Sequence, residues 1–115
     1  MIEETILKYM SDNLAYPVYM ERPENPDEKY YLIERVGGSR SNHLYTSIFA
    51  IQSVARSLFD AASMNEELLM VVYNDAGGIC RCSEISKAVL NGNSNDTDPE
   101  TGEYKYQAVF EIYHY

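Results

Sequence analysis

The last twelve residues, "YKYQAVFEIYHY", constrain the fold more than any other segment, because they are rich in strand-forming residues and contain no glycine or proline. Every second residue of a strand lies on the same face. One face therefore carries Tyr104, Tyr106, Ala108, Phe110, Ile112 and His114, and the other carries Lys105, Gln107, Val109, Glu111, Tyr113 and Tyr115. The first face is predicted to pack on the core. The second becomes aromatic toward its end, which fits either a second layer of the protein or the surface of a neighbouring copy.

Two segments have helical spacing. In "EETILKYMSDNL" the acidic Glu3 and Glu4 suit the first turn of a helix. Its apolar stripe is Ile6, Leu7, Met10 and Leu14. The second helix is predicted to begin at Ser57, which resembles a capping box with Asp60, and to stop at Gly77. Its inner face is Leu58, Ala61, Ala62, Asn65, Leu68, Leu69 and Val72.

Residues rich in β-branched and aromatic types predict the strands. These strands are 18–21, 29–36, 43–55, 79–90 and 104–115. "GGSRSN", residues 37–42, is predicted as the flexible tip of a hairpin, because glycine and small polar residues favour turns. Three prolines at positions 17–26 predict an extended loop, and the acidic segment 91–103 predicts another.

The order of these segments is helix, short strand, two strands, helix and two strands. It predicts an α+β fold, with a single mostly antiparallel or mixed β-sheet and two α-helices packed on one face. With 115 residues, the chain is expected to be a single α+β domain spanning 1–115.

The chain is strongly acidic, with 18 Asp and Glu against 9 Lys and Arg and a formal charge of -9. Such a surface argues against direct nucleic-acid recognition and against an anionic membrane as partner. No apolar stretch is long enough to span a bilayer, and "MIEETILKYM" does not resemble a secretory signal. A cytoplasmic location is therefore expected.

Cys80 and Cys82 are separated by one residue. In a strand they would share a face at roughly 6.6 Å between Cα atoms, near the limit of disulfide geometry. A zinc site would need two more ligands, and only His43 and His114 are available, far along the chain. Buried or half-buried thiols are therefore predicted, and no metal site.

Acidic residues in the segment 91–103 raise the alternative of a calcium loop; they are Asp96, Asp98, Glu100 and Glu103. The spacing lacks the glycine and the flanking helices of an EF-hand, so a solvated loop is predicted. "GGSRSN" lacks the spacing of either nucleotide-binding fingerprint, so no cofactor is predicted.

The sequence contains no recognisable catalytic set. His43 and His114 stand outside any nucleophile or metal motif, and no serine lies in a nucleophile elbow. No catalytic residue is predicted, and the protein is not expected to be an enzyme. Tyr30 and Tyr31, by contrast, are adjacent in one predicted strand and must face opposite ways. Aromatic residues on both faces predict that a partner covers part of the outer face.

Three segments in this order carry a resemblance to a known family: "YPVYMERPENPDEKYYLIERVGGSRSN", "FAIQSVARSLFDAASMNEEL" and "TDPETGEYKYQAVFEIYHY". They resemble the small tail terminator, or tail completion, proteins of long-tailed bacteriophages and prophages, over nearly the whole chain.

The resemblance implies a structural protein that forms a homo-oligomeric ring, expected as a hexamer, which ends the tail tube and joins it to the head connector. Its partners would be itself, the tail tube protein and the head connector protein. It would be found in the host bacterial cytoplasm during assembly and then in the neck of the virion tail. Another neck protein, such as a head closure or adaptor protein, is the nearest alternative. A small cytoplasmic enzyme using Cys80, Cys82 or His43 is a more distant one.

Two groups of residues are predicted as protein contacts. Arg40, Ser41 and Asn42 belong to the predicted hairpin tip, where projecting loops commonly bind partners. Tyr113 and Tyr115 lie on the face of the last strand that the core does not need, and buried aromatic residues carry much interface energy.

Overall fold

The computed structural model describes residues 2–22, 24, 28–41, 44–73, 78–95, 97 and 103–115. In chain order they form α1 (Ile2–Asn13), β1 (Val18–Tyr19), β2 (Tyr30–Ser41), β3 (Leu44–Ala55), α2 (Leu58–Val72), the 3-10 helix η1 (Gly78–Arg81), β4 (Ile85–Asn95) and β5 (Tyr104–His114). The five strands make one sheet in the order β1-β2-β3-β5-β4. β1 is parallel to β2 and the other pairs are antiparallel, so the sheet is mixed.

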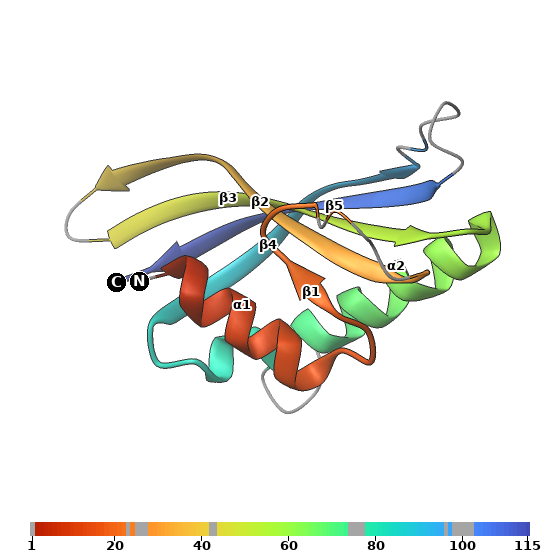
Figure 1. Cartoon of the computed structure of the whole chain (residues 1–115). Coiled ribbons are helices and arrows are strands. Elements are labelled where there is room, and N and C mark those ends of the chain that lie inside the picture. Colours follow the sequence, from red (N-terminus) through yellow and green to blue (C-terminus); the bar gives the residue numbers. More distant parts are fainter. Residues whose placement is uncertain are drawn as a thin grey trace.

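Both helices lie on one face of the sheet, and none of the described residues forms a layer on the other (Figure 1). α2 packs on the two central strands, β3 and β5. The predicted α+β fold, with one mixed sheet and two helices on one face, is confirmed.

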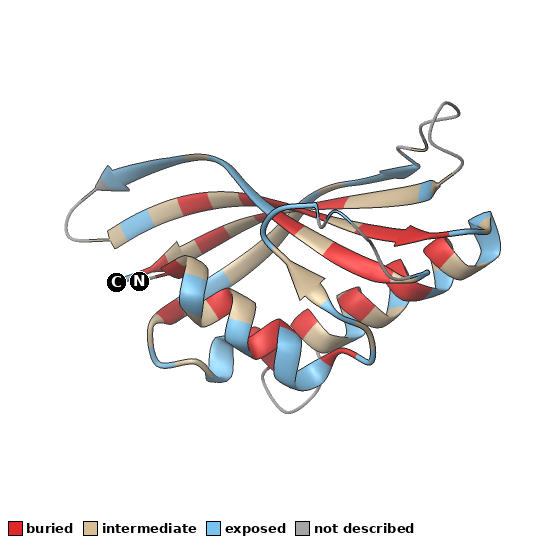
Figure 2. Ribbon diagram, in the orientation of Figure 1, coloured by how far each residue is buried: buried red, intermediate tan, exposed pale blue. Residues whose placement is uncertain are grey.

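The core lies between the helices and the sheet (Figure 2). Buried positions alternate along β5, whereas β3 is buried on both faces over 49–51 and 53–55. On β5 the residues that face the helices and are buried are Ala108, Phe110, Ile112 and His114. The residues between them, from Lys105 to Tyr113, are half-buried on the open face. The period-two pattern of this strand is therefore confirmed, and it identifies the core face correctly.

Both helices begin near their predicted positions and most of their predicted inner residues are buried or half-buried, but Leu58 of α2 is exposed, so its place on the inner face is wrong. Ile6 and Met10 are buried on α1, and Leu68 and Val72 are buried on α2. The Ser57 hydroxyl accepts a hydrogen bond from the Asp60 amide at 3.1 Å, which satisfies one free donor of the first turn of α2. α2 already ends at Val72, so the stop predicted at Gly77 is wrong; Gly77 itself lies outside the described residues.

The hairpin tip predicted at 37–42 is wrong, because β2 continues through the glycines to Ser41. Gly37 pairs with Ile48 and Ser41 pairs with Leu44, after a bulge at Val36. Glycine is needed here for close packing and not for a turn: a Cβ on Gly38 would lie 2.7 Å from the Thr46 carbonyl oxygen. The short strand predicted at 18–21 is also reduced, to Val18–Tyr19.

The strand predicted at 79–90 is shifted, and η1 occupies its first part. Gly78 starts η1 with φ of 55°, a left-handed conformation that favours glycine. Ile79 is then buried in the core, and β4 begins only at Ile85. β4 extends to Asn95, into the segment predicted as a loop.

Tyr30 and Tyr31 face opposite sides of the sheet, as predicted, and both are buried. Tyr31 enters the core and its hydroxyl donates to the Met64 carbonyl at 3.2 Å. The Tyr30 hydroxyl donates to the Glu103 carboxylate at 3.0 Å, and its ring packs edge-on against Tyr19. Tyr30 therefore gives no support for a partner, because the chain itself buries it, and the cover of the outer face by a partner stays a prediction.

Replacing Gly78 with Ala should lower the free energy of unfolding by at least about 2 kcal/mol, from the left-handed backbone and a severe clash. The added Cβ would lie 2.0 Å from the Val72 carbonyl oxygen. Gly92→Ala is the control, because the nearest atom to its Cβ would be 4.0 Å away. Urea unfolding of both variants tests this, and equal stability would contradict it.

Burial raises the pKa of the Tyr31 hydroxyl. Its contribution to stability is therefore complete below the pKa of an unfolded tyrosine, about 10, and is lost as the pH rises above that value. Tyr31→Phe should cost about 1 kcal/mol at neutral pH, through the lost hydrogen bond, yet lose less stability than wild type at alkaline pH. Urea unfolding at neutral pH and near pH 11 measures both effects; parallel curves would contradict the second.

Candidate functional site

The predicted contact residue Arg40 lies exposed near the end of β2, on the strand and not in a loop. Its guanidinium lies 5.3 Å from the centre of the Tyr45 ring. Tyr45 in turn stacks on His114, with ring centres 5.5 Å apart and an interplanar angle of 14°. The three side chains come from neighbouring strands at paired positions, Arg40 with Tyr45 and Tyr45 with His114. They form a stack that holds the Arg40 charge near one end of the sheet.

The other predicted residues of the β2–β3 connection add little detail. Ser41 is the last residue of β2 and pairs with Leu44. Asn42 and His43 lie outside the described residues.

Tyr113 lies on the open face of β5, where it pairs with Thr46 of β3 and Lys87 of β4. The Lys87 ammonium group is 5.9 Å from the centre of its ring. The pKa of the Tyr113 hydroxyl is raised, mainly by a hydrogen bond with Glu111 and to a smaller extent by burial. Tyr113 is therefore half-buried among the side chains of its own sheet.

Tyr115 follows the end of β5 and is 68% exposed. Its amide donates to the Glu84 carbonyl at 3.0 Å. Together with Ile2, Glu3, Arg35, Tyr45, Glu84 and His114, it lines a hollow of about 340 Å³ on the helix side of the sheet. Because the strand ends at His114, the alternation does not extend to Tyr115. The expectation that Tyr113 and Tyr115 share one surface is therefore wrong.

His114 is a buried structural residue. Its Nε2 atom lies 2.8 Å from the Ser47 hydroxyl oxygen, and both side chains are buried. A serine beside a histidine is half of a nucleophilic set, but Ser47 is 0% exposed, so no substrate can reach it. The pair instead satisfies two polar groups inside the core.

The two cysteines are not equivalent. Cys82 is half-buried, as predicted, whereas Cys80 is exposed at the end of η1, which corrects the prediction. Both lie outside the strand that was expected to carry them. Burial raises the pKa of Cys82, and nearby Cys80 and Glu84 raise it further. A raised pKa leaves less thiolate at neutral pH, which makes Cys82 a poor nucleophile.

Of the four acidic loop residues, the structure describes only Glu103. Its carboxylate accepts hydrogen bonds from Arg22 at 2.9 Å and from the Tyr30 hydroxyl at 3.0 Å. Glu103 is therefore a structural residue and not a solvated one. Within the described part of the chain, no group of three or more His, Cys, Asp or Glu could hold a metal ion.

A further hollow lies between α1 and η1, and no pattern in the sequence indicates it. Its volume is about 460 Å³. It is lined by Thr5, Lys8, Tyr9, Asp12, Asn13, Arg81 and Cys82. These seven residues come from two segments that are far apart in the chain, so no local pattern in the sequence indicates the hollow.

The free edges of the sheet are the second feature that the strand pattern alone did not predict. β4 has a strand on one side only, and β1 covers β2 only at Tyr31 and Leu32. Among the described residues, 33–41 of β2 and β4 beyond Ile85 thus have no strand paired to their outer edge. β2 has one bulge, at Val36. β4 has two bulges, at Ser86 and Asn91.

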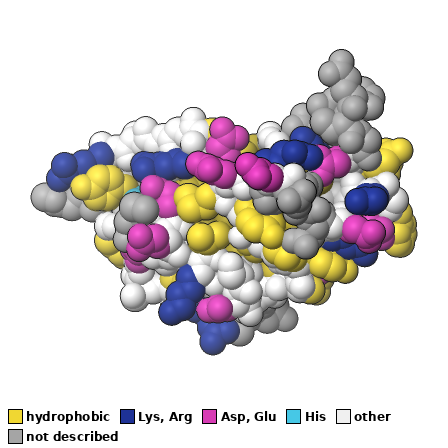
Figure 3. Space-filling view, viewed as in Figure 1, with side chains coloured by type: hydrophobic (Ala, Val, Ile, Leu, Met, Phe, Trp, Pro, Cys, Tyr) yellow, Lys and Arg dark blue, Asp and Glu magenta, His cyan; other side chains and the backbone are white. Residues whose placement is uncertain are grey.

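Charges are mixed over the face seen in Figure 3, where basic and acidic side chains are interspersed. No helix in the described residues is long and apolar enough to cross a membrane. Models of known protein families do not match the chain, and a search of curated proteins finds no significant match.

Proposed function

We propose that this protein is a structural subunit that assembles head-to-tail into a closed ring, and that the ring is the tail terminator of a long-tailed phage or prophage. The ring would end the tail tube and present a surface to the head connector. The observation that carries the proposal is the pair of free sheet edges, on β2 and β4. The resemblance of the sequence to tail terminator proteins supplies the biological setting.

The directions of the edge strands suit such an assembly. β2 and β5 run one way, and β3 and β4 run the other, because each neighbouring pair is antiparallel. A second copy rotated about an axis along the strands would place its β2 antiparallel to β4 of the first. The antiparallel ladder would continue across the contact, and the helices of all copies would stay on the same side. Contacts between two different surfaces form a closed ring when the rotation divides a full turn.

The edges are also long enough to pair. Exposed edge strands tend to pair with other chains, and natural proteins that avoid this shorten or charge them. β4 spans 85–95, and its described charge is Lys87 alone. The free part of β2 spans 33–41, of similar length, and it carries three charged residues, Glu34, Arg35 and Arg40. Arg40 and its stack on Tyr45 and His114 lie at the end of this edge, which keeps Arg40 as a proposed contact residue.

The direct test is negative-stain imaging of the purified protein, alone and with tail tubes of the phage or prophage that encodes it. Rings at tube ends are expected. Tubes that remain free of the protein would contradict the terminator function, and a monomer under all conditions would contradict ring formation as well.

Val36→Pro and Asn91→Pro should each prevent the ring while leaving the fold intact. Both positions are bulges, where proline is tolerated, and proline removes a backbone donor from the free edge. Sedimentation measures assembly, and circular dichroism checks the fold. Val36→Ala is the matched control, since it shortens the side chain and keeps the donor. Rings formed by both folded proline variants would refute edge pairing and leave ring formation standing.

Ring formation should be favoured by higher salt or by a few millimolar magnesium, because several copies of charge -9 repel one another.

The substitution Tyr115→Ser should weaken the ring at every salt concentration. The control Phe59→Ser, which replaces an 80% exposed aromatic residue of α2, should not. Tyr115 is substituted and the C-terminus is kept, because a deletion that reached Tyr113 and His114 would remove residues of β5. Sedimentation across a salt series decides, and a ring that forms best at low salt would contradict the expectation.

A further inference from the structure

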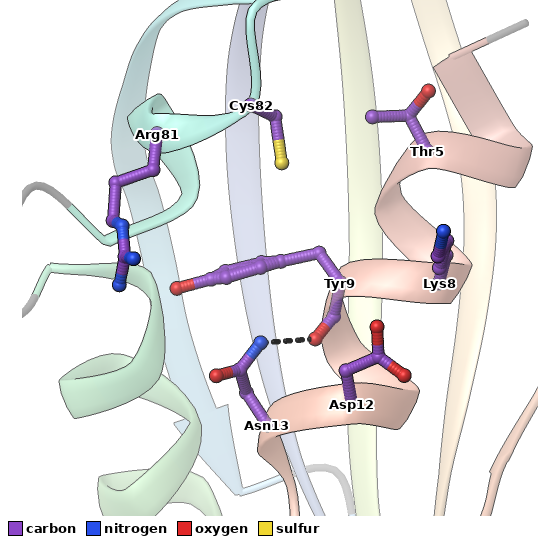
Figure 4. A pocket seen from close by; sticks show the side chains of 7 residues that line it. All are labelled: Thr5, Lys8, Tyr9, Asp12, Asn13, Arg81 and Cys82. Atoms are coloured by element: carbon purple, nitrogen blue, oxygen red, sulfur yellow. Dashed lines mark hydrogen bonds between the residues drawn. The ribbon is translucent and has the colours of Figure 1, made fainter.

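The hollow between α1 and η1 has the size and lining of a small-molecule site. Its volume, about 460 Å³, falls within the range of about 300–1,000 Å³ that is usual for ligand pockets. Figure 4 shows the Tyr9 ring crossing it, with the Arg81 guanidinium beside the ring's hydroxyl end and the Cys82 sulfur pointing toward the ring. The hollow therefore combines an aromatic surface with charged groups at its sides.

Two cations line this hollow, Lys8 from α1 and Arg81 from η1. Both are exposed, and neither forms an ion pair with any described residue. The ion pairs found among the described residues use Arg22, Lys29 and Arg35. In a chain with twice as many acidic as basic residues, two unpaired cations at one hollow leave positive charge available there for a ligand.

Most other polar groups of the hollow are already engaged. The Tyr9 hydroxyl donates to the Val71 carbonyl at 2.8 Å, and the Asn13 amide donates to the Tyr9 carbonyl at 2.8 Å. The Thr5 hydroxyl donates to the Glu84 carboxylate. Asp12 is the one acidic side chain that lines the hollow, and it opposes an anion.

We infer that this hollow binds a small organic anion with more than one acidic group, one of which meets Arg81 and another Lys8, on the two sides of the Tyr9 ring. Arg81 can donate two parallel hydrogen bonds to such a group, and Lys8 adds a compact charge. The apolar part of the ligand would lie against the Tyr9 ring, beside the Cys82 thiol. The site is on the helix side of the sheet, near the start of β4, and the argument for it does not use the proposed ring.

Citrate and inorganic phosphate are suitable probes, with binding measured by calorimetry at low ionic strength. A dissociation constant on the order of 1 mM is expected for citrate, since the site is open and the protein is acidic. The double variant Lys8→Gln/Arg81→Gln should weaken citrate binding about fivefold, the sum of two exposed charge contacts. Lys87→Gln, which removes the same charge elsewhere, should change it less than about twofold. Asp12→Asn should strengthen it.

The cysteines provide a second readout in the wild-type protein. Bound citrate should slow alkylation of Cys82, which lines the hollow, and leave alkylation of Cys80 unchanged. N-ethylmaleimide is neutral and does not compete for the cations, and trypsin cleavage after Arg81 places the two thiols on separate peptides for mass spectrometry. The inference is overturned if neither probe binds saturably, if the double variant binds citrate as well as Lys87→Gln does, or if both thiols are protected equally.

Discussion

The antiparallel pairing of β3 with β5 is the interaction on which the rest of the structure depends. It joins the middle of the chain to its end, from Tyr45 with His114 to Ala55 with Tyr104. At its centre Phe49 faces Phe110, and both are fully buried. α2 packs on these two strands and on no other strand as closely. Burying this aromatic pair removes a large apolar area from water, which stabilises the central ladder.

The central pair also decides which surfaces remain unpaired. β2 adds to β3, and β4 adds to β5, so the two outer strands are at opposite sides of one sheet. Their outer edges have no paired strand within the described chain, apart from the two positions of β2 covered by β1. A layer of helices covers one face of the sheet, whereas the protection of the edge strands that can be seen in the described residues is their bulges. The proposal of a ring follows from this arrangement and from the opposite directions of the two edge strands.

The side chains that could have carried chemistry are mostly used by the fold. His114 and Ser47 satisfy each other inside the core, and Glu103 holds Arg22 and Tyr30. The raised pKa of Cys82 disfavours its thiolate. By contrast, Lys8 and Arg81 are free to meet a ligand, because η1 brings Arg81 beside α1. Among the described residues, surface cations, backbone edges and the exposed Cys80 thiol are thus available for contacts.

The sequence by itself determined both helices, the cap at Ser57, the two-faced pattern of β5 and the opposite directions of Tyr30 and Tyr31. These features depend on local spacing, which repeats every two residues in a strand and about every 3.6 in a helix. Only the tertiary structure decided that Gly37 and Gly38 continue a strand, since pairing with β3 outweighs their preference for turns. The same holds for Tyr30, which is buried by Glu103 and Tyr19. The hollow at Lys8 and Arg81 likewise joins residues far apart in the chain, and no local pattern encodes such a contact.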